Sequence, residues 1–582
     1  MEIKRTFDIL ESGLKKFPLD IALASKVNGE WISYSTKEYK DIVDQVSEGL
    51  ISLGVKKGDK VATVTNNRPE WNFINYGVAQ IGAILCPVYP TISKSDYKFI
   101  FNDAEIKYVF LSDQDLYSKI EAIRSEVPSL KNVYSFDKID GVSHWKDVLL
   151  SENSSEISTQ LESLKAGIVE KDLVTLIYTS GTTGNPKGVM LSHENLVSNA
   201  VAGVAYLPVE YGDKALSFLP LCHVFERSIL NIYTLGGISI YYAESIETIG
   251  DNIKEIKPHI FTAVPRLIEK VYDKVIAGGN QKSGLVKQLF LWAVGKAQAF
   301  EIGQSVGLGT ALAEKLVFAK IKLGLGGNVK CIVSGSAALQ TRLTRFFWGI
   351  GIPILEGYGL TETSPIVSVN TLEPNGTKFG TIGRVIDDVT VKIAEDGEIL
   401  VKGPNVMMGY YNNPEKTAEV MTGDWFHTGD IGVFDGEYLK ITDRKKEIFK
   451  TSGGKYVAPQ PLENKMKESL FIEQIMVIGE GRKHPAALVV PNFVHVKSWC
   501  RHKGYSFGTN EEIICMDEVK KKIASDIETL NATFGKVEQI KKFELIGKEW
   551  CVQDGELTPT MKLKRNVIKE NCADLFVKIY GE

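Results

Sequence analysis

Residues 178–188 read Tyr178-Thr179-Ser180-Gly181-Thr182-Thr183-Gly184-Asn185-Pro186-Lys187-Gly188. They follow the apolar run Leu173-Val174-Thr175-Leu176-Ile177, which predicts a buried strand. Glycines let the backbone turn so that its N–H groups point at an anion, while hydroxyls add donors and Lys187 adds charge. The segment therefore predicts a loop that binds nucleotide phosphates; an ordinary turn rich in Gly, Ser and Thr is the alternative. It is not a Walker A loop, because Asn185 and Pro186 separate Gly184 from Lys187.

The rest of the chain predicts an α/β fold, because apolar runs alternate with amphipathic stretches. Residues 60–64 and 84–89 predict strands, and residues 71–84 predict a helix between them. The charged run at 443–447 is typical of a solvated surface or of an interdomain linker. We therefore expect a large N-terminal domain over residues 1–442 and a small α/β domain over residues 443–582.

Residues 283–323 predict a helical hairpin inserted in the large domain. Apolar residues recur there at helical spacing on both sides of a break at Gly307-Leu308-Gly309. The first helix carries Val286, Leu289, Phe290, Ala293, Ala297 and Phe300, and the second carries Leu312, Leu316, Val317 and Ile321. A packed helix pair, a contact with a lipid surface and a dimer contact would each explain this pattern.

Composition narrows the class of protein. The formal net charge is -4 and the pI is about 6.2, which argues against a nucleic-acid partner. The 7 cysteines are scattered without a Cys-x-x-Cys pair, as in a cytosolic protein with reduced thiols and no zinc site. No secretory signal and no apolar stretch long enough to span a bilayer is apparent. We expect a cytoplasmic protein, and leave open peripheral contact with the inner face of a membrane; the oligomeric state is also open.

Together with motifs that follow in order, the 178–188 segment resembles the signature of the adenylate-forming (AMP-binding) superfamily. The resemblance extends from about residue 34 to the C-terminus. The further motifs span residues 335–339, 356–363, 425–430 and 557–565. It implies a large adenylate-forming domain of mixed sheets with helices, followed by a mobile C-terminal α/β domain.

The resemblance also implies a nucleotide site for ATP and Mg²⁺. Tyr358 would stack on adenine, Thr361 would contact the α-phosphate and Glu362 would hold Mg²⁺, a metal that prefers hard oxygen ligands. Asp430 and Arg444 would hold the ribose. The remaining nucleotide contacts would come from Thr179, Ser180, Gly181, Thr182, Thr183, Gly184, Lys187, Gly335, Ser336, Ala337, Glu356, Gly357 and Gly359.

Lysines of the C-terminal region match catalytic and hinge positions of the family. Lys562 matches the catalytic lysine, with Lys564 as the alternative, because Thr560-Met561 stands where many relatives have Ser-Gly. Lys450 and Lys455 match positions that assist adenylation, and Lys446 matches the hinge. Thr361, Glu362, Lys450 and Lys562 are thus the implied catalytic residues.

Residues 220–227, Pro-Leu-Cys-His-Val-Phe-Glu-Arg, resemble the acyl-site motif of the long-chain fatty acyl-CoA synthetase branch. His223 and Phe225 would contact the acyl substrate, although a core position for His223 is an alternative. The implied reaction joins a fatty acid to coenzyme A through an acyl-adenylate, with AMP and pyrophosphate as products. A fatty acyl-AMP ligase that loads an acyl-carrier protein, and a synthetase that prefers medium chains, are the rival assignments.

Overall fold

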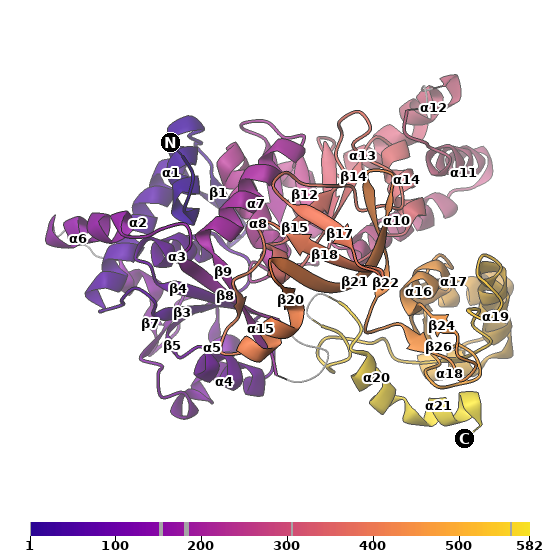
Figure 1. The fold of residues 1–582 in the computed structure, drawn as a ribbon. Coiled ribbons are helices and arrows are strands. Elements are labelled where there is room, and N and C mark those ends of the chain that lie inside the picture. The colour runs from indigo at the N-terminus through magenta and orange to yellow at the C-terminus, as the bar shows by residue number, and fades with distance from the viewer. Residues whose placement is uncertain (1, 150–154, 180–184, 304–306, 559–560, 582) are drawn as a thin grey trace. The chain divides into compact units, whose positions relative to one another are not determined.

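The computed structural model describes residues 2–149, 155–179, 185–303, 307–558 and 561–581 (Figure 1). The chain divides into two compact units. The large unit comprises Met1–Ser336, Thr341–Val391 and Val401–Phe426, and the small unit comprises Ala337–Gln340, Lys392–Leu400 and His427–Glu582. Each unit is described here by itself. The divisions fall inside strands β17 (Thr390–Ile393), β18 (Glu398–Lys402) and β21 (Trp425–Asp435).

One sheet of the large unit supports the predicted phosphate loop. Its strands run in the order β19-β9-β8-β4-β3-β5-β6-β7. All neighbours from β8 to β7 are parallel, whereas β9 is antiparallel to both β8 and β19. The bounds are β19 Gly409–Tyr410, β9 Lys187–Ser192, β8 Leu173–Thr179, β4 Ile84–Val88, β3 Lys60–Val64, β5 Ile106–Leu111, β6 Asn132–Ser135 and β7 Ser143–His144.

Both faces of this sheet are buried, which explains why its strands are rich in apolar residues. In β3, Val61 faces one hydrophobic cluster, while Ala62 and Val64 face another. The second cluster is closed by helices α4 (Lys94–Asp103) and α5 (Gln114–Glu121). The strands predicted at 60–64 and 84–89 are therefore confirmed.

A second sheet of the large unit has the order β16-β15-β14-β13-β12-β10-β11-β1-β2. It is parallel from β14 to β1 and antiparallel at both edges. The bounds are β16 Arg384–Val385, β15 Ile366–Val369, β14 Ile354–Gly359, β13 Cys331–Ser334, β12 Ile260–Ala263, β10 Lys214–Ser217, β11 Ser239–Tyr242, β1 Leu23–Val27 and β2 Glu30–Tyr34. Strand β13 ends directly before Gly335.

A layer of helices shares one hydrophobic cluster with strands of both sheets. They are α1 (Thr6–Lys16), α2 (Thr36–Ser52), α3 (Pro69–Gln80), α7 (His193–Tyr206) and α8 (Val224–Gly236) (Figure 1). Further helices of the large unit are α6 Ser155–Ala166, α9 Ile249–Ile256, α10 Pro265–Asn280, α14 Thr341–Gly349 and α15 Pro414–Val420.

The helix predicted at 71–84 forms but ends earlier. It begins at Pro69, whose fixed φ suits a first helical turn, and ends at Gln80. Gly82 adopts a left-handed φ of 69°, which breaks the helix before Ile84 enters strand β4.

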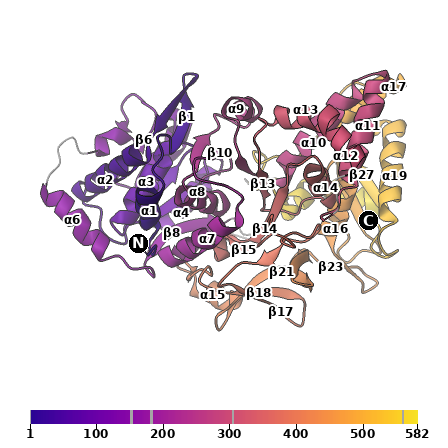
Figure 2. The same ribbon diagram turned by 90° about the horizontal axis from the view of Figure 1, so that it is seen from above.

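The predicted helical hairpin is also present (Figure 1 and Figure 2). It consists of α11 (Gly284–Gln298), α12 (Leu308–Ala313), a π-helical turn (Glu314–Phe318) and α13 (Ala319–Gly324). Ala293 and Ala297 are buried, as their spacing predicts. Val286, Leu312 and Leu316 are exposed instead, so part of the apolar pattern faces outward.

The small unit has its own hydrophobic core. Helices and strands after β21 are β22 Tyr438–Arg444, β23 Phe449–Lys450, β24 Tyr456–Val457, α16 Pro459–Met466, β25 Ile472–Ile478, β26 Ala486–Pro491, α17 Phe493–Lys503, α18 Asn510–Cys515, α19 Asp517–Asn531, β27 Lys542–Leu545, α20 Arg565–Asn571 and α21 Ala573–Tyr580. Strand β22 pairs antiparallel with β21. The mixed α/β architecture of a large and a small part is as predicted.

Candidate active site

The two ends of the predicted phosphate loop are held together by strand pairing. Thr179, the last residue of β8, lies opposite Lys187, the first residue of β9. Ser180, Gly181, Thr182, Thr183 and Gly184 lie outside the described residues. The loop thus leaves the carboxyl end of a parallel strand, where open α/β sheets bind ligands.

Glu362 lies on a short turn that follows β14. A Cβ at Gly359 would stand 1.7 Å from the Pro365 carbonyl oxygen, so the chain can turn back here only with glycine. The 3₁₀ turn Thr361–Thr363 follows, and the Thr363 hydroxyl accepts a hydrogen bond from the Leu360 N–H at 2.9 Å. This turn presents Thr361 and Glu362 as half-buried side chains beyond the strand end.

Tyr410 joins the Glu362 turn to the phosphate-loop strand. Its hydroxyl donates a hydrogen bond of 2.8 Å to Glu362 Oε1. Its ring lies beneath Lys187, with Nζ 5.3 Å from the ring centroid. A neutral donor on the carboxylate and an aromatic face on the ammonium leave both formal charges in place.

Two segments that are predicted to contact the nucleotide, 335–337 and 356–359, also meet. Gly335 follows β13, and a Cβ there would be 3.6 Å from the Gly357 carbonyl oxygen. Glu356 and Tyr358 are buried in β14, and the Thr344 hydroxyl donates to Glu356 Oε1 at 2.9 Å. Ser336 is half-buried with a left-handed φ of 69°. Ala337 belongs to the small unit and is exposed.

The predicted acyl-site motif lies beside Gly335. The ring of Phe225 lies 3.4 Å from the position of a Cβ on Gly335. His223 is the N-cap of α8, and its Nδ1 accepts a hydrogen bond from the Phe225 N–H at 3.2 Å. The structure therefore brings Phe225 next to Gly335, and places His223 at the start of the helix that carries Phe225.

Two buried charged residues fix the start of α8. Glu226 accepts hydrogen bonds of 2.6 Å from the hydroxyls of Ser217 in β10 and Thr262 in β12. Burial raises the pKa of Glu226 to about 7, although the two hydroxyl donors oppose that rise. These bonds tie the acyl-site motif to the parallel sheet.

Arg227 makes the corresponding contacts with the other sheet. Its guanidinium donates to the Thr175 hydroxyl in β8 at 2.6 Å and to the Asn75 side chain in α3 at 2.7 Å. Burial lowers the pKa of Arg227 to about 10. Adjacent residues of one helix thus bond to strands of both sheets.

In the small unit, the predicted ribose pair is formed across two strands. Asp430 of β21 lies opposite Arg444 of β22, and Arg444 Nε donates to Asp430 Oδ1 at 3.0 Å. The buried Glu398 supports the same turn, because it accepts bonds from the Gly429 N–H at 2.9 Å and from Lys445 Nζ at 2.9 Å. His427 Nδ1 lies 3.0 Å from Glu398 Oε2.

The charges around Glu398 set its protonation. Burial would raise the pKa of this carboxyl, but hydrogen bonds from Lys445, His427 and the Gly429 backbone lower it overall.

The pKa of Asp443, which is buried in β22, is raised instead. Burial, with the nearby Glu447 and Glu463 carboxyls, raises its pKa to about 7 against the opposing effects of the Arg444 N–H and Arg565.

Lys562 lies in a narrow loop. Leu557 and Leu563 form an antiparallel bridge, and Thr558 bonds the Lys562 backbone in both directions, with N–H to O distances of 2.8 and 3.0 Å. Lys564 lies at the base of the loop, where its N–H donates to the Glu556 carbonyl oxygen at 2.8 Å and it caps α20. Arg565 then pairs with Glu463 at 2.8 Å.

The other predicted lysines of the small unit are exposed. Lys446 lies in the turn after β22, and Arg565 pairs with the next residue, Glu447, at 3.1 Å. Lys450 lies in β23 with its Nζ 5.5 Å from the Tyr456 ring centroid. Lys455 lies in the turn between β23 and β24, where its carbonyl oxygen accepts a hydrogen bond from the Thr451 N–H at 2.9 Å.

Comparison with known families decides the relationship. A profile described as "AMP-binding enzyme" matches residues 10–411, and one described as "AMP-binding enzyme C-terminal domain" matches residues 446–582. The chain belongs to the AMP-binding enzyme family. Within it, the chain is 32% identical to "Long-chain-fatty-acid--CoA ligase FadD15" of Mycobacterium bovis, over 96% of this chain and 94% of that protein. It is 31% identical to human "Long-chain-fatty-acid--CoA ligase 1", over 94% and 83%.

Solved structures agree with the fold of this AMP-binding enzyme. The anthranilate CoA ligase AuaEII in complex with anthranoyl-AMP superimposes with a TM-score of 0.73, at 19% identity and 98% coverage of both chains. At that identity the likeness establishes the fold alone.

Two residues of this AMP-binding enzyme's candidate site were missed from the sequence, namely Tyr410 and Glu398. Their partners lie 48 and 29–47 residues away in the chain, which no local motif reveals. The available signals were a tyrosine pair at 410–411 and a carboxylate directly before the apolar run 399–401.

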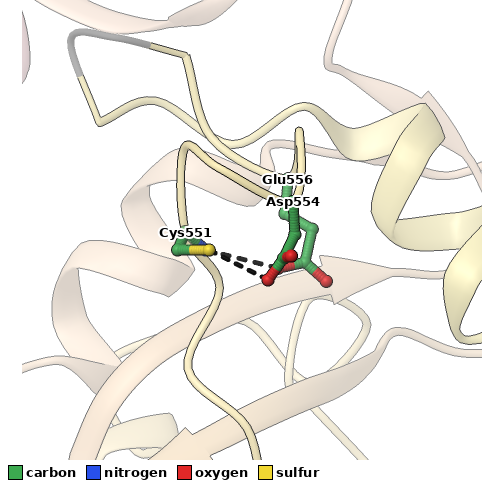
Figure 3. A group of neighbouring side chains, drawn as sticks. All are labelled: Cys551, Asp554 and Glu556. Atoms are coloured by element: carbon green, nitrogen blue, oxygen red, sulfur yellow. Dashed lines mark hydrogen bonds between the residues drawn. The ribbon is translucent and has the colours of Figure 1, made fainter. Parts of the chain in front are cut away.

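A second cluster with metal-type ligands lies before the Lys562 loop (Figure 3). Ligand atoms of Cys551, Asp554 and Glu556 lie within 4.8 Å of one another. They already have partners: Cys551 Sγ donates to Asp554 at 3.0 Å, its N–H donates to Glu556 at 3.3 Å, and Lys548 pairs with Asp554 at 2.5 Å. These contacts stabilise a turn.

Proposed function

We propose that this AMP-binding enzyme is a long-chain-fatty-acid–CoA ligase that forms acyl-CoA, AMP and pyrophosphate from a fatty acid, ATP and coenzyme A. The observation that carries the proposal is the approach of Phe225, from the acyl-site motif, to Gly335 beside the nucleotide motif. The two relatives described above are named long-chain-fatty-acid–CoA ligases and match nearly the whole chain.

In the first half-reaction, a carboxylate oxygen of the fatty acid attacks the α-phosphorus of ATP, and the bond to pyrophosphate breaks. Lys187 and the loop at 179–184 hold the phosphates that leave, and Thr361 contacts the α-phosphate. Tyr358 stacks on adenine, and Gly335, Ser336, Ala337, Glu356, Gly357 and Gly359 supply further contacts with the nucleotide. Lys562 stabilises charge that spreads between the carboxylate and the α-phosphate. Loss of such a group commonly costs roughly a hundred-fold in rate.

The residues around Glu362 fit a magnesium ion. Oε1 accepts the Tyr410 hydroxyl, a neutral donor, so the carboxylate keeps its charge and a second hard oxygen. Magnesium in nucleotide sites is held by one or two carboxylates together with substrate phosphates and water. Bound Mg²⁺ would neutralise charge on the pyrophosphate that leaves.

In the second half-reaction, the thiol sulfur of coenzyme A attacks the acyl carbonyl carbon, and AMP leaves with the bonding electrons. Asp430 and Arg444 hold the ribose hydroxyls. We propose that residues 443–582 form a mobile domain that turns about Lys446 between the half-reactions, so that Lys562 serves adenylation alone. Lys450 assists adenylation from the same domain. Hinges of this kind are a few residues at the end of an element.

The test measures AMP formation from ATP and Mg²⁺ with fatty acids of graded length, with and without coenzyme A. We expect turnover that requires coenzyme A and is fastest with long chains. Acyl-AMP without thioester would replace this assignment with a ligase that loads a carrier protein, and fastest turnover with medium chains would correct the substrate class. No AMP with any acid would refute the proposal.

The enzyme is also proposed to bind the inner face of a membrane through the α11–α13 hairpin. No helix in the described part of the chain is long and apolar enough to cross a bilayer. The hairpin nevertheless exposes apolar side chains: Leu308 is 94% exposed and Leu285 83%, and Leu308, Leu312 and Leu316 recur every four residues. A helix face of this kind suits the boundary of a lipid layer.

Charge favours an anionic lipid surface as the partner of this hairpin. The net charge of the chain is -4, yet lysines outnumber carboxylates between residues 282 and 324. These are Lys282, Lys287, Lys296, Lys315, Lys320 and Lys322 against Glu301 and Glu314. Lysines beside an apolar face add attraction to anionic headgroups.

Co-sedimentation with vesicles tests the membrane proposal. We expect binding to vesicles that contain phosphatidylglycerol and weaker binding to phosphatidylcholine alone. Leu308→Glu with Leu312→Glu should abolish binding, whereas Val494→Glu, at an exposed apolar residue of α17, should not. If the double variant changed the molar mass in solution instead, the hairpin would be a contact between copies.

A further inference from the structure

Tyr410 occupies a place that no motif in the sequence assigned. It is 6% exposed and ends the short strand β19, which pairs antiparallel with β9. Tyr410 lies opposite Val189, two residues after Lys187. The Tyr411 N–H donates to the Gly188 carbonyl oxygen at 2.8 Å. Strand pairing therefore fixes Tyr410 against the strand that begins at Lys187.

The same segment is fastened to the Glu362 turn. The Met407 N–H donates to the Glu362 carbonyl oxygen at 2.8 Å, and the Met408 N–H donates to the Met190 carbonyl oxygen at 3.0 Å. The Tyr410 N–H donates to the Thr417 hydroxyl at 2.9 Å. Residues 407–411 thus bond, through their backbone, to both segments that carry charged groups of the site.

The Tyr410 side chain then contacts both charged groups. Its hydroxyl donates to Glu362 Oε1 at 2.8 Å, and its ring lies 5.3 Å from Lys187 Nζ. A tyrosine ring is rigid, so the hydroxyl and the face cannot move independently. One side chain therefore sets the direction of the carboxylate and the position of the ammonium together.

We propose that Tyr410 is a positioning residue that aligns the metal-binding carboxylate of Glu362 with the phosphate-binding ammonium of Lys187. The Tyr410 hydroxyl bonds Oε1, so Oε2 would be the oxygen left to a metal, and the ring would hold Lys187 in place for the phosphates of ATP. The inference rests on the proposed function, because it assumes that Glu362 binds Mg²⁺ and that Lys187 binds the phosphates of ATP.

The two halves of the tyrosine can be separated by substitution. Tyr410→Phe removes the hydroxyl and keeps the ring, whereas Tyr410→Leu removes both. Tyr411→Phe is the matched control: Tyr411 is the adjacent residue, and its ring faces Lys60 at 5.3 Å rather than Lys187. The measurement is calorimetric binding of α,β-methylene-ATP to the full chain over a series of Mg²⁺ concentrations, with no turnover.

We expect Tyr410→Phe to raise the Mg²⁺ concentration at half-maximal effect by roughly ten-fold or more, the scale of one hydrogen bond to a charged group. Nucleotide affinity without metal should be unchanged in Tyr410→Phe and weakened in Tyr410→Leu. Tyr411→Phe should change neither quantity.

An unchanged Mg²⁺ midpoint in Tyr410→Phe, beside normal Mg²⁺ dependence in the wild type, would overturn the positioning role alone. A lower thermal unfolding temperature with that unchanged midpoint would show that Tyr410 serves only the fold. If wild-type protein bound the nucleotide with no Mg²⁺ dependence, the metal assignment of Glu362 would fail first, and the positioning role with it.

Discussion

Glu362 in the large unit and Glu398 in the small unit are carboxylates held in opposite ways. Glu362 is half-buried and accepts one hydrogen bond from a neutral hydroxyl, that of Tyr410. Glu398 is buried and accepts bonds from Lys445, from the Gly429 backbone and from His427 when that ring nitrogen carries the proton. Glu362 is oriented by a neutral donor, whereas the charge of Glu398 is paired within the fold.

The difference teaches how a carboxylate that binds a ligand can be told from a structural one. A carboxylate already paired with cations gains little from a further cation, whereas one with a neutral donor is oriented but not neutralised. By this criterion Glu362 is a candidate ligand of a metal, and Glu398 is a support for the turn between His427 and Asp430.

The largest expected effect lies outside both carboxylates, at Lys562. Lys562→Ala should lower the rate of acyl-AMP formation roughly a hundred-fold or more, because a cation beside the transferring charge is lost. Thioester formation from supplied acyl-AMP and coenzyme A should change far less. The two rates are measured separately by release of pyrophosphate and by loss of free thiol.

Lys564→Ala is the matched control, since Lys564 lies two residues away at the base of the same loop. It should retain adenylation. A loss confined to Lys564→Ala would move the catalytic role to that residue, and equal losses in both half-reactions for Lys562→Ala would contradict a role in adenylation alone.

The carboxylates themselves should separate activity from stability. Glu362→Gln should reduce adenylation roughly a hundred-fold while the free energy of unfolding changes by less than about 1 kcal/mol, because its partner is neutral. Glu398→Gln should instead lower the free energy of unfolding by roughly 1–3 kcal/mol, because buried donors lose a charged acceptor. Denaturant unfolding measures the free energy of unfolding of both variants, and pyrophosphate release measures their rate of adenylation.

Similar stability losses in both variants would remove the contrast. So would a Glu398→Gln variant that unfolds like the wild type but has lost Mg²⁺-dependent adenylation, since that result would make Glu398 the ligand.

Much of the fold could be predicted because its strands are buried on both faces. The runs at 60–64 and 84–88 are mostly apolar, and they became β3 and β4. The helix end near residue 80 could not be predicted from apolar spacing, since it depends on the left-handed φ of Gly82. The exposure of Leu312 and Leu316 was likewise hidden, because spacing cannot say which side of a helix pair faces solvent.

The candidate site divides in a similar way. Residues in local motifs, such as Thr361 with Glu362 and Asp430 in its turn, could be named from sequence. Tyr410 could not, because its role depends on a hydrogen bond to a residue 48 positions away. Asp443 looked like part of a solvated run, yet its burial follows from strand pairing with β21.

Glu226 extends the contrast to a carboxylate with neutral donors and no exposure. Burial raises the pKa of Glu226 to about 7, above its usual value near 4.5. The native state therefore holds the proton more tightly than the unfolded chain does. Stability from this group is present below about pH 4.5 and is lost as the pH rises to about 7, at roughly 1.4 kcal/mol per pKa unit.

Glu226→Gln should remove this dependence, so that the wild type loses up to about 3 kcal/mol relative to the variant between pH 4.5 and pH 8. Denaturant unfolding of both proteins across that range gives the difference. Burial lowers the pKa of His193 to about 3, so both proteins lose stability as the pH falls below about 6.5. This contribution is the same in the wild type and the variant, and it cancels in the difference. A constant difference would show that Glu226 is ionised in the native state throughout.

The smallest expected effect concerns the backbone of the Lys562 loop. Met561, the residue before Lys562, has a left-handed φ of 63° and a side chain that is 44% exposed. That conformation costs a residue with a Cβ roughly 1 kcal/mol, whereas it costs glycine almost nothing. Met561→Gly should therefore be more stable than Met561→Ala by about 1 kcal/mol, the reverse of the order seen in a helix or strand interior. Denaturant unfolding of the two variants decides this, and because both remove the same side chain, lost contacts cancel. If the alanine variant were as stable as the glycine variant, the loop would relax out of the left-handed conformation. The backbone bonds between Thr558 and Lys562 would then not fix the position of Lys562.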